Sequence, residues 1–334
     1  MNVVSTRERV GWLLLACWVI WSMIAAGVGH QTLPLLTPYV TAPVSLVIGL
    51  VLGRRLVARE SVAAAVLVVV SAYLLVATLL SGGAGGGALG YANANAALGL
   101  QVVACAAVIA READGWARRG LVTAAALAAG STVLARSAAG MVLLVVLLAV
   151  IVLAVSLPVR SVPSRLWPSV VGAAATAVTA GGVIWLALQD TWAAPVTRAL
   201  SSARHTLWRD ALELWQAHPL VGSGPGSFVQ FSTTAHDPDL AFAHMSLLQV
   251  GAETGVIGVV LFVALIGVGF VLASRSRPSA TLIVAAALTV LLMHSFIDHL
   301  LEFWPILLTF GVTLGFAKPP GIEPGSDSDT EAAR

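Results

Sequence analysis

The sequence predicts an all-α, polytopic membrane protein of about ten transmembrane helices, with one large loop between the seventh and the eighth. Of its 334 residues 58% are hydrophobic and only 10% are charged, which excludes an ordinary soluble domain. The apolar residues gather in runs near the length at which a helix crosses a hydrocarbon core of about 30 Å. These runs are continuous and do not alternate, which favours helices over transmembrane strands.

Seven expected spans precede the polar loop and three follow it. The first run follows two arginines, as a signal peptide does, but the many spans behind it favour a retained first helix. A Gly-rich stretch connects the third run to the fourth, and almost no loop joins the fifth to the sixth. In chain order the expected spans are 11–28, 38–53, 61–80, 92–110, 120–135, 139–157, 167–188, 244–272, 279–296 and 303–317.

Basic residues give these spans an orientation. If the N-terminus is inside and each run crosses once, 14 of the 18 basic residues fall on the inner side. This is a strong positive-inside signal, and it supports an even number of spans with both termini in the cytoplasm. We therefore expect a multi-pass plasma-membrane protein whose polar loop, about 189–243, faces outward. The four outer basic residues are Arg136, Arg198, Arg204 and Arg209.

The chain is expected to form a single integral-membrane domain over residues 1–318. Residues 319–334 are acidic and lack an apolar pattern, so we expect a disordered cytoplasmic tail. Cys17 and Cys105 fall inside apolar runs, which indicates buried thiols. Nothing in the sequence suggests a disulfide framework, a metal site or a cofactor.

All seven histidines lie at or beyond the outer ends of the expected spans. Because histidine titrates near neutral pH and is a common general base, this favours the outer face as the working face. The alternative is that outer loops simply offer more positions for polar residues. The seven are His30, His205, His218, His236, His244, His294 and His299.

The polar loop contains a predicted helix. Ser201 or Ser202 can cap a helix that runs to about Ala217, and its tryptophan-bearing apolar face fits a membrane surface. Arg209 lies four residues before Glu213, so these two side chains are expected to pair.

A Gly-rich turn follows this helix. Gly224 and Gly226 allow backbone conformations that aim N–H groups at an anion, although most such loops are only turns. Before the fourth span, Asn93 and Asn95 are expected either to cap the helix and bond to its neighbours or to line a polar cavity.

Two of the outer arginines are placed to hold a phosphate. Arg136 lies in the tight connection between the fifth and sixth runs, where an arginine near membrane depth needs a partner or a polar cavity. Arg204 lies at the start of the loop helix. A guanidinium matches phosphate geometry in a bidentate fork. The alternatives are salt bridges to Asp298, Glu302 or Glu253, or contacts with lipid headgroups.

His244 begins the eighth expected span. On a helix it shares a face with Gly251 and Gly255, whose spacing allows close helix packing, while Gln249 and Glu253 point to another side. This histidine is either an interfacial residue or a catalyst.

The last outer turn places His294, Asp298 and Glu302 on one helical line, with His299 off that line. The residues on this line can pair with the arginines or orient His244.

Two long motifs resemble the O-antigen ligase and polymerase family. Residues 204–228 have the family's arginine, its tryptophan, an Ala-Leu helix, Pro-Leu and a Gly-x-Gly-x-Gly-x-Phe turn. Residues 244–258 are similar to its His-(Asn/Ser)-x-x-Leu-Gln…Glu-x-Gly-x-x-Gly segment, with Met245 where Asn or Ser is common. Residues 134–140 and 294–298 resemble shorter family segments. The likeness covers roughly residues 91–310, and the chain is shorter than many members.

The resemblance implies a C-type glycosyltransferase architecture. It implies transfer of a glycan from a polyprenyl-diphosphate-linked donor at the outer face, without a metal or a nucleotide sugar. Arg136 and Arg204 would bind the diphosphate, and His244 would activate the acceptor hydroxyl as a base or by hydrogen bonding. The expected partners are this donor, a glycan, lipid or protein acceptor, and membrane lipids, but no nucleic acid. Expected substrate-binding residues are Gly224, Gly226, Arg209, Glu253, His294 and Asp298.

Two other functions remain open at this stage. A peptidoglycan-type glycan polymerase has a similar number of spans and a large outer loop, but its motifs are not found, and architecture alone is weak evidence. A transporter or flippase of a lipid-linked or anionic substrate would also use outer arginines and histidines. It predicts an inverted repeat with broken helices, which the sequence does not display.

Overall fold

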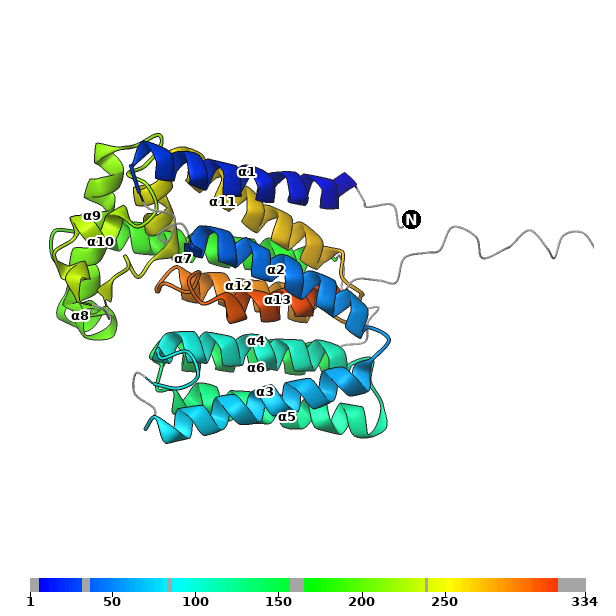
Figure 1. Ribbon diagram of the computed structural model, residues 1–334. Helices are drawn as coiled ribbons and strands as arrows, with labels where there is room; N and C mark the ends of the chain where they lie inside the picture. The colour runs from blue at the N-terminus through cyan, green and yellow to red at the C-terminus, as the bar shows by residue number, and fades with distance from the viewer. Residues whose placement is uncertain (1–5, 32–36, 83–85, 157–164, 238–239, 318–334) are drawn as a thin grey trace, which may run out of the picture.

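The computed structural model describes residues 6–31, 37–82, 86–156, 165–237 and 240–317 (Figure 1). Within these ranges every regular element is a helix. The expected tail, residues 319–334, lies outside the described residues. The elements are α1 (Thr6–Val28), α2 (Thr37–Leu56), α3 (Glu60–Leu80), α4 (Ala92–Ala110), α5 (Gly115–Leu134), α6 (Ala138–Ser156), α7 (Trp167–Ala187), α8 (Ala194–Leu200), α9 (Ser202–Ala217), α10 (Ser227–Phe231), a 3₁₀ turn (Thr234–His236), α11 (Ser246–Ser274), α12 (Thr281–Ser295) and α13 (Trp304–Ala317).

Each of the ten expected spans coincides with a helix, and seven helices of the described chain are long and apolar enough to cross a membrane. These seven are α1, α2, α3, α4, α6, α7 and α11. The other three fall short for visible reasons. Helix α5 carries Arg118 and Arg119 near its start, and α12 and α13 have only 15 and 14 residues. The all-helical membrane class is confirmed, with seven spans supported by length and composition.

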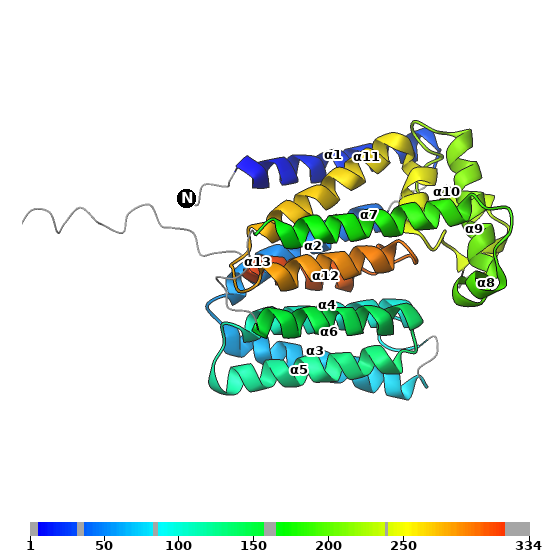
Figure 2. The same cartoon turned by 180° about the vertical axis from the view of Figure 1, so that it is seen from behind.

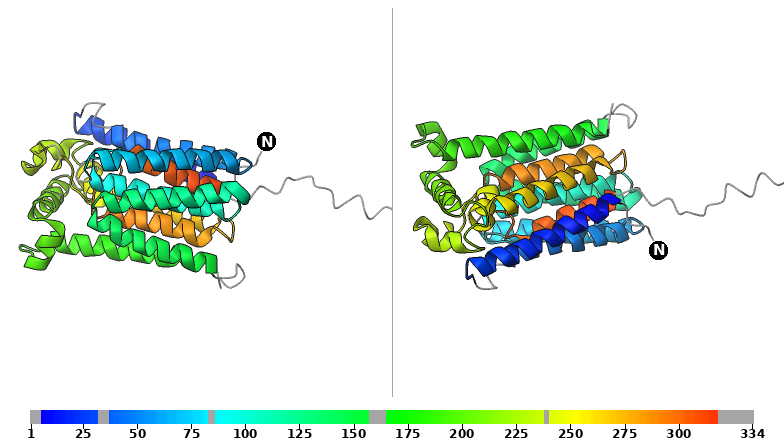
Figure 3. Two further views of the ribbon diagram at one scale, coloured as in Figure 1. Left: turned by 90° about the horizontal axis from the view of Figure 1, so that it is seen from below. Right: turned by 90° about the horizontal axis from the view of Figure 1, so that it is seen from above.

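The long helices lie side by side in one bundle, with α8, α9 and α10 gathered at one end (Figures 1 and 2). Helix α1 begins at the opposite end. Helices α3, α4, α5 and α6 form one side of the bundle, and α1 and α11 form the other (Figure 3). Most residues of α4 are buried, because this helix packs against α5, α6, α12 and α13.

Helices α2 and α13 pack through glycines on both partners. A Cβ atom added at Gly49 or Gly53 would overlap the carbonyl oxygen of a residue in α13. Reciprocally, a Cβ at Gly311 or Gly315 would overlap a carbonyl oxygen of α2. Each helix therefore uses small residues at four-residue spacing to bring the two backbones into contact.

Helix α11 breaks at Gly255, whose φ of 67° lies in the left-handed region. The break frees the carbonyls of Ala252 and Glu253, which accept hydrogen bonds from the N–H groups of Ser223 and Gly224 at 3.0 and 2.9 Å. In return, the N–H of Val256 donates to the carbonyl of Pro219 at 2.8 Å. The Gly-rich turn thus satisfies backbone groups that would otherwise be left unpaired in an apolar surrounding.

Helix α9 begins as predicted at Ser201, whose hydroxyl accepts from the N–H of Arg204 at 3.5 Å. Its apolar face covers protein instead of lying on a membrane surface. Trp208 is fully buried, and the ring of Trp215 lies where Gly251 of α11 leaves room. Helix α9 packs against α11 and α7, so the prediction of a membrane-surface helix is wrong for this face.

Candidate active site

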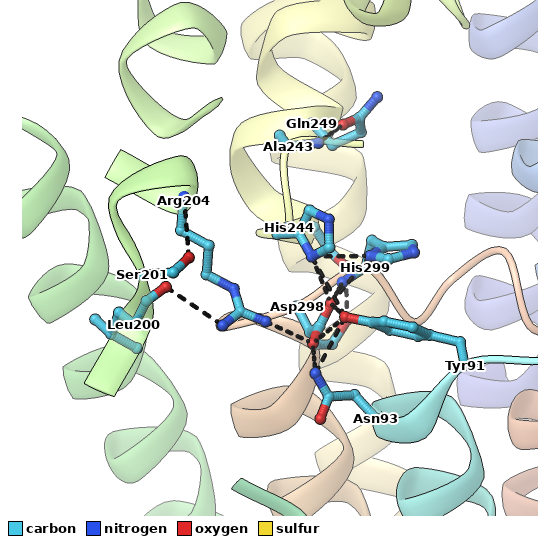
Figure 4. A network of polar contacts seen from close by, with 12 residues as sticks. Tyr91, Asn93, Leu200, Ser201, Arg204, Ala243, His244, Gln249, Asp298 and His299 are labelled. Carbon is cyan, nitrogen blue, oxygen red and sulfur yellow. Dashed lines mark hydrogen bonds and ion pairs between the residues drawn. The ribbon is translucent and has the colours of Figure 1, made fainter. Parts of the chain in front are cut away.

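The buried carboxylate of Asp298 is the centre of the polar cluster at the α9 end of the bundle (Figure 4). Asp298 is 1% exposed and lies in residues 296–303, the non-helical segment between α12 and α13. The sequence placed it on a helical line with His294 and Glu302, but α12 ends at Ser295, so that line does not exist. Side-chain donors to the carboxylate come from Tyr91, Asn93, Arg204, His244 and His299.

His244 lies just before α11, not on it, with a left-handed φ of 50°. Its carbonyl accepts from the indole N–H of Trp208 at 3.3 Å. The preceding N–H, of Ala243, donates to the amide oxygen of Gln249 at 2.7 Å. These two bonds hold the strained backbone and point the imidazole at Asp298, where its Nδ1 lies 2.9 Å from Oδ1. The predicted shared face with Gly251 and Gly255 is therefore wrong.

The Asp298 contact fixes how the His244 ring can act. An ionised carboxylate only accepts hydrogen bonds, so Nδ1 of His244 carries the proton in this contact. Burial opposes ionisation of Asp298, but the hydrogen bonds from His244 and His299 outweigh it and lower the pKa of the carboxyl well below its usual value. The other ring nitrogen of His244, Nε2, is buried without a hydrogen-bond partner. In the neutral ring this nitrogen has a free lone pair and can accept a proton.

His299 is a member of the site that the sequence did not identify. Its Nδ1 also lies 2.9 Å from Oδ1 of Asp298, and its ring stacks on Phe242 with centroids 4.8 Å apart. Burial lowers the pKa of this imidazole. A helical projection turned His299 away from Asp298, whereas in the non-helical segment the backbone N–H of His299 also donates to Oδ1 at 2.8 Å. The signal available in the sequence was that His299 directly follows Asp298.

Tyr91 and Asn93, before and at the start of α4, supply two further donors. The Tyr91 hydroxyl lies 2.8 and 2.9 Å from the two oxygens of Asp298, and the Asn93 amide donates to Oδ2. Asn95 instead bonds to the backbone of Leu89 and Gly86, which is a structural role. Of the two interpretations of these amides, the structural one applies to Asn95. Asn93 instead joins the polar cluster.

Arg204 joins the cluster from the first turn of α9. Its Nη2 pairs with Oδ2 of Asp298 at 3.1 Å, and its Nη1 lies 3.4 Å from the carbonyl of Leu200. The Nε atom is buried without a partner. The guanidinium therefore keeps donor capacity for a further oxygen while it holds Asp298.

Arg136 is not brought to this cluster by any contact among the described residues. It lies in the short connection between α5 and α6 with a φ of 56°, and its side chain is exposed. The alternative interpretation, a salt bridge of Arg136 to Asp298, Glu302 or Glu253, is not found within the described chain, whereas Arg204 does form such a salt bridge to Asp298.

The Gly-rich turn does hold an acidic side chain, but it is that of Glu253. Its Oε1 accepts from the backbone N–H of Phe228 at 3.3 Å and from the Gln249 amide at 2.7 Å, and its Oε2 accepts from the Tyr39 hydroxyl at 2.6 Å. The N–H of Gly224 is used by the Glu253 carbonyl. The substrate-binding prediction for Gly224, Gly226 and Glu253 therefore gives way to a structural role.

Arg209 and His294 also lie away from the cluster. Arg209 pairs with Asp190 at 3.6 Å on the surface, not with Glu213, and both side chains of this pair are exposed. His294 is fully buried within α12, and neither of its ring nitrogens has a hydrogen-bond partner. Among the described residues, no hydrogen bond or ion pair joins either side chain to Asp298.

An apolar cavity leads away from the cluster between α1, α2, α11, α12 and α13. His299, Glu302 and Gln249 line its polar end, and Arg54, near the end of α2, also lines it. Between the polar end and Arg54, the cavity wall consists mainly of aliphatic and aromatic side chains from these five helices.

Three atoms of the cluster have the spacing of metal ligands. His244, Asp298 and His299 offer ligand atoms within 4.8 Å of one another. The same distances arise when both imidazoles donate to one carboxylate oxygen. The hydrogen bonds of Asp298 thus account for this arrangement without an ion.

Residues 123–263 match the family model described as O-Antigen ligase. The match is to the same family that the two long motifs resemble, so the resemblance is confirmed over these residues. Among curated proteins, none matches the chain. The match to the O-antigen ligase family supports a glycan-transfer role and an enzyme of the glycosyltransferase type.

The O-antigen ligase match covers only part of the polar cluster. Arg204 and His244 fall within it, whereas Tyr91, Asp298 and His299 lie outside. The bundle brings the residues outside the match to the matched ones, so the cluster joins four segments distant in sequence, around Tyr91, Arg204, His244 and Asp298.

Proposed function

We propose that this protein transfers a glycan from a polyprenyl-diphosphate-linked donor to an acceptor hydroxyl at the outer face of the plasma membrane. The reaction needs no metal. One observation carries the proposal. Arg204 and His244, both within the matched family segment, contact the same buried carboxylate, Asp298. An anion-binding cation and a base thereby lie beside each other at one end of an apolar bundle.

His244 is the base in this reaction. Its Nε2 takes the proton of the acceptor hydroxyl as the hydroxyl oxygen forms a bond to the anomeric carbon of the donor sugar. The bond between that carbon and the phosphate oxygen breaks, and its electron pair leaves with the diphosphate. Asp298 stabilises the imidazolium that forms, because it stays ionised and accepts from Nδ1. A hydroxyl that reaches Nε2 also satisfies a buried nitrogen that has no partner.

Arg204 stabilises the leaving diphosphate. Charge builds up on the phosphate oxygens in the transition state, and a preorganised guanidinium in a site shielded from water stabilises it most. The unpartnered Nε of Arg204 is available for this contact. Arg136 is assigned to the same diphosphate on the family resemblance, and its exposed side chain leaves it free to meet a bound substrate.

The apolar cavity supports a lipid-linked donor. Its polar end meets the cluster at His299, and its wall is lined by the apolar side chains of five helices. An isoprenoid chain in this cavity places its diphosphate near Arg204. A nucleotide sugar has no long apolar chain that could occupy this cavity.

The charge bias supports the outer face. With 14 of 18 basic residues on the expected inner side, the start of α1 is cytoplasmic. Helices α8 to α10 lie at the opposite end of the bundle (Figure 1), and Arg204 of α9 joins the cluster there. The glycan donor and its acceptor therefore meet the enzyme from outside.

Reconstitution tests the proposal directly. The purified chain is incubated with polyprenyl-diphosphate-linked glycan and a hydroxyl acceptor, and coupled product is measured with and without a chelator. We expect product in both conditions, and His244→Ala is expected to abolish it. His236→Ala is the matched control, because His236 is exposed and contacts no member of the cluster.

Full activity of His244→Ala would remove the base assignment. A transporter would instead move its lipid-linked substrate across vesicles in which no coupling occurs. Flux that persists in His244→Ala, without product from the unmodified chain, favours that alternative.

A further inference from the structure

Glu302 occupies the polar end of the apolar cavity and has no role in the reaction above. It lies in the segment between α12 and α13, and it lines the cavity together with His299. Its Oε2 atom is buried and has no hydrogen-bond partner. A buried carboxyl oxygen without a partner is costly unless the group is neutral or a ligand satisfies it.

The surroundings of Glu302 favour its neutral form. Burial, the carboxylate of Glu253 on α11 and that of Asp298 together raise the pKa of Glu302 to about 8. Tyr39 of α2 also lines the cavity, and its hydroxyl is engaged by Glu253. Arg54, the cation that lines the cavity, lies near the other end of α2.

The remaining groups near Glu302 do not neutralise it by pairing. Arg204 is held by Asp298, and both His299 and His244 direct Nδ1 at that carboxylate. His294 on α12 is buried without a hydrogen bond. A carboxyl in this position carries its proton at neutral pH and acts as an O–H donor.

We propose that Glu302 binds the lipid-linked donor as a neutral hydrogen-bond donor to a diphosphate oxygen, at the point where the isoprenoid chain enters the cavity. This rests on the proposed function, since it assigns the diphosphate to that site. A neutral carboxyl adds a hydrogen bond without adding negative charge beside an anion. An ionised Glu302 repels the same diphosphate, so donor binding weakens as pH rises.

The test compares equilibrium binding of two probes to the full chain in nanodiscs. The probes are a polyprenyl diphosphate without a glycan and the uncharged polyprenol of the same length. The neutral fraction of a group with a pKa of about 8 falls about tenfold between pH 7 and pH 9. We expect the Kd of the diphosphate to rise by about this factor, and the Kd of the polyprenol to stay constant.

Glu302→Gln keeps the shape and an N–H donor but cannot ionise. We expect this variant to bind the diphosphate at pH 7 nearly as tightly as the unmodified chain does. Its Kd is not expected to show the roughly tenfold rise between pH 7 and pH 9. Glu302→Ala is expected to bind weakly at both values. Glu213→Gln is the matched control, because Glu213 is exposed on α9.

Several outcomes would overturn the assignment of Glu302. These are the same pH dependence in Glu302→Gln as in the unmodified chain, unchanged binding in Glu302→Ala, or no binding of the diphosphate at pH 7. Failure of the proposed function looks different. There the diphosphate binds with the expected pH dependence, but no glycan is transferred.

Discussion

At the scale of single residues, Asp298 decides how the other members of the cluster are arranged. It receives hydrogen bonds from five side chains, which are both imidazoles, Arg204, Tyr91 and Asn93, more donors than a single ion pair requires. A carboxylate offers about four lone-pair sites, so these donors use its full accepting capacity. Loss of its charge therefore affects the base and the anion-binding cation together.

Asp298→Asn tests this dependence. The amide can no longer hold His244 in the tautomer that leaves Nε2 basic, and it leaves Arg204 without its counter-charge. By analogy with other carboxylate–histidine pairs, we expect kcat to fall by about a hundredfold to ten-thousandfold. Steady-state rates at varied donor concentration separate kcat from KM, and we expect most of the loss in kcat.

The matched control is Asp190→Asn, because Asp190 is 94% exposed and pairs with the exposed Arg209. We expect its rates to match those of the unmodified chain. An Asp298→Asn enzyme with near-normal kcat shows that the carboxylate does not act through His244.

At the scale of elements, hydropathy predicted where the helices lie but not what the breaks between them do. The boundaries at Ser295 and Trp304 match the expected spans closely, since burial of apolar residues determines them. The segment between them is not helical, although it buries Phe296, Asp298, His299 and Leu300. A helical projection therefore put His294 in the site and left His299 out. Periodicity cannot detect such a change of backbone geometry.

The Gly-rich turn illustrates the same limit. From its composition, Gly224 was expected to bind an external anion, but its N–H bonds to the backbone of the broken helix α11. Which partner a backbone N–H finds depends on tertiary contacts between distant segments. The long motif predicted a site around His244, but the contacts of each residue in it became visible only in the fold.

Gly255→Ala tests the break in α11. An alanine there must adopt a φ of 67°, and its Cβ would overlap the carbonyl oxygen of Leu220. We expect destabilisation by about 1–3 kcal/mol, measured as a lower Tm of the detergent-solubilised chain. Gly267→Ala is the control on the same helix, because nothing lies within 4 Å of its added Cβ. Equal Tm values for the two variants contradict the structural role of the break.

At the scale of the whole molecule, the bundle gives the chain two different ends. One end carries α8 to α10 and the cluster, and α1 begins at the other (Figure 1). The apolar cavity lies among five helices with its polar end at the cluster. The proposed transferase, which would receive its donor from the membrane and its acceptor from water, fits this arrangement and works only if the α9 end faces outward.

Cysteine labelling in intact cells tests the orientation. Arg198→Cys places a thiol on α8, and Arg118→Cys places one near the start of α5, both at exposed positions. The native Cys105 is buried and Cys17 lies within α1, so the unmodified chain gives the background. We expect a membrane-impermeant maleimide to label Arg198→Cys at once and Arg118→Cys only after permeabilisation. The reverse pattern would place the cluster on the cytoplasmic side and would contradict the orientation inferred from the positive-inside bias.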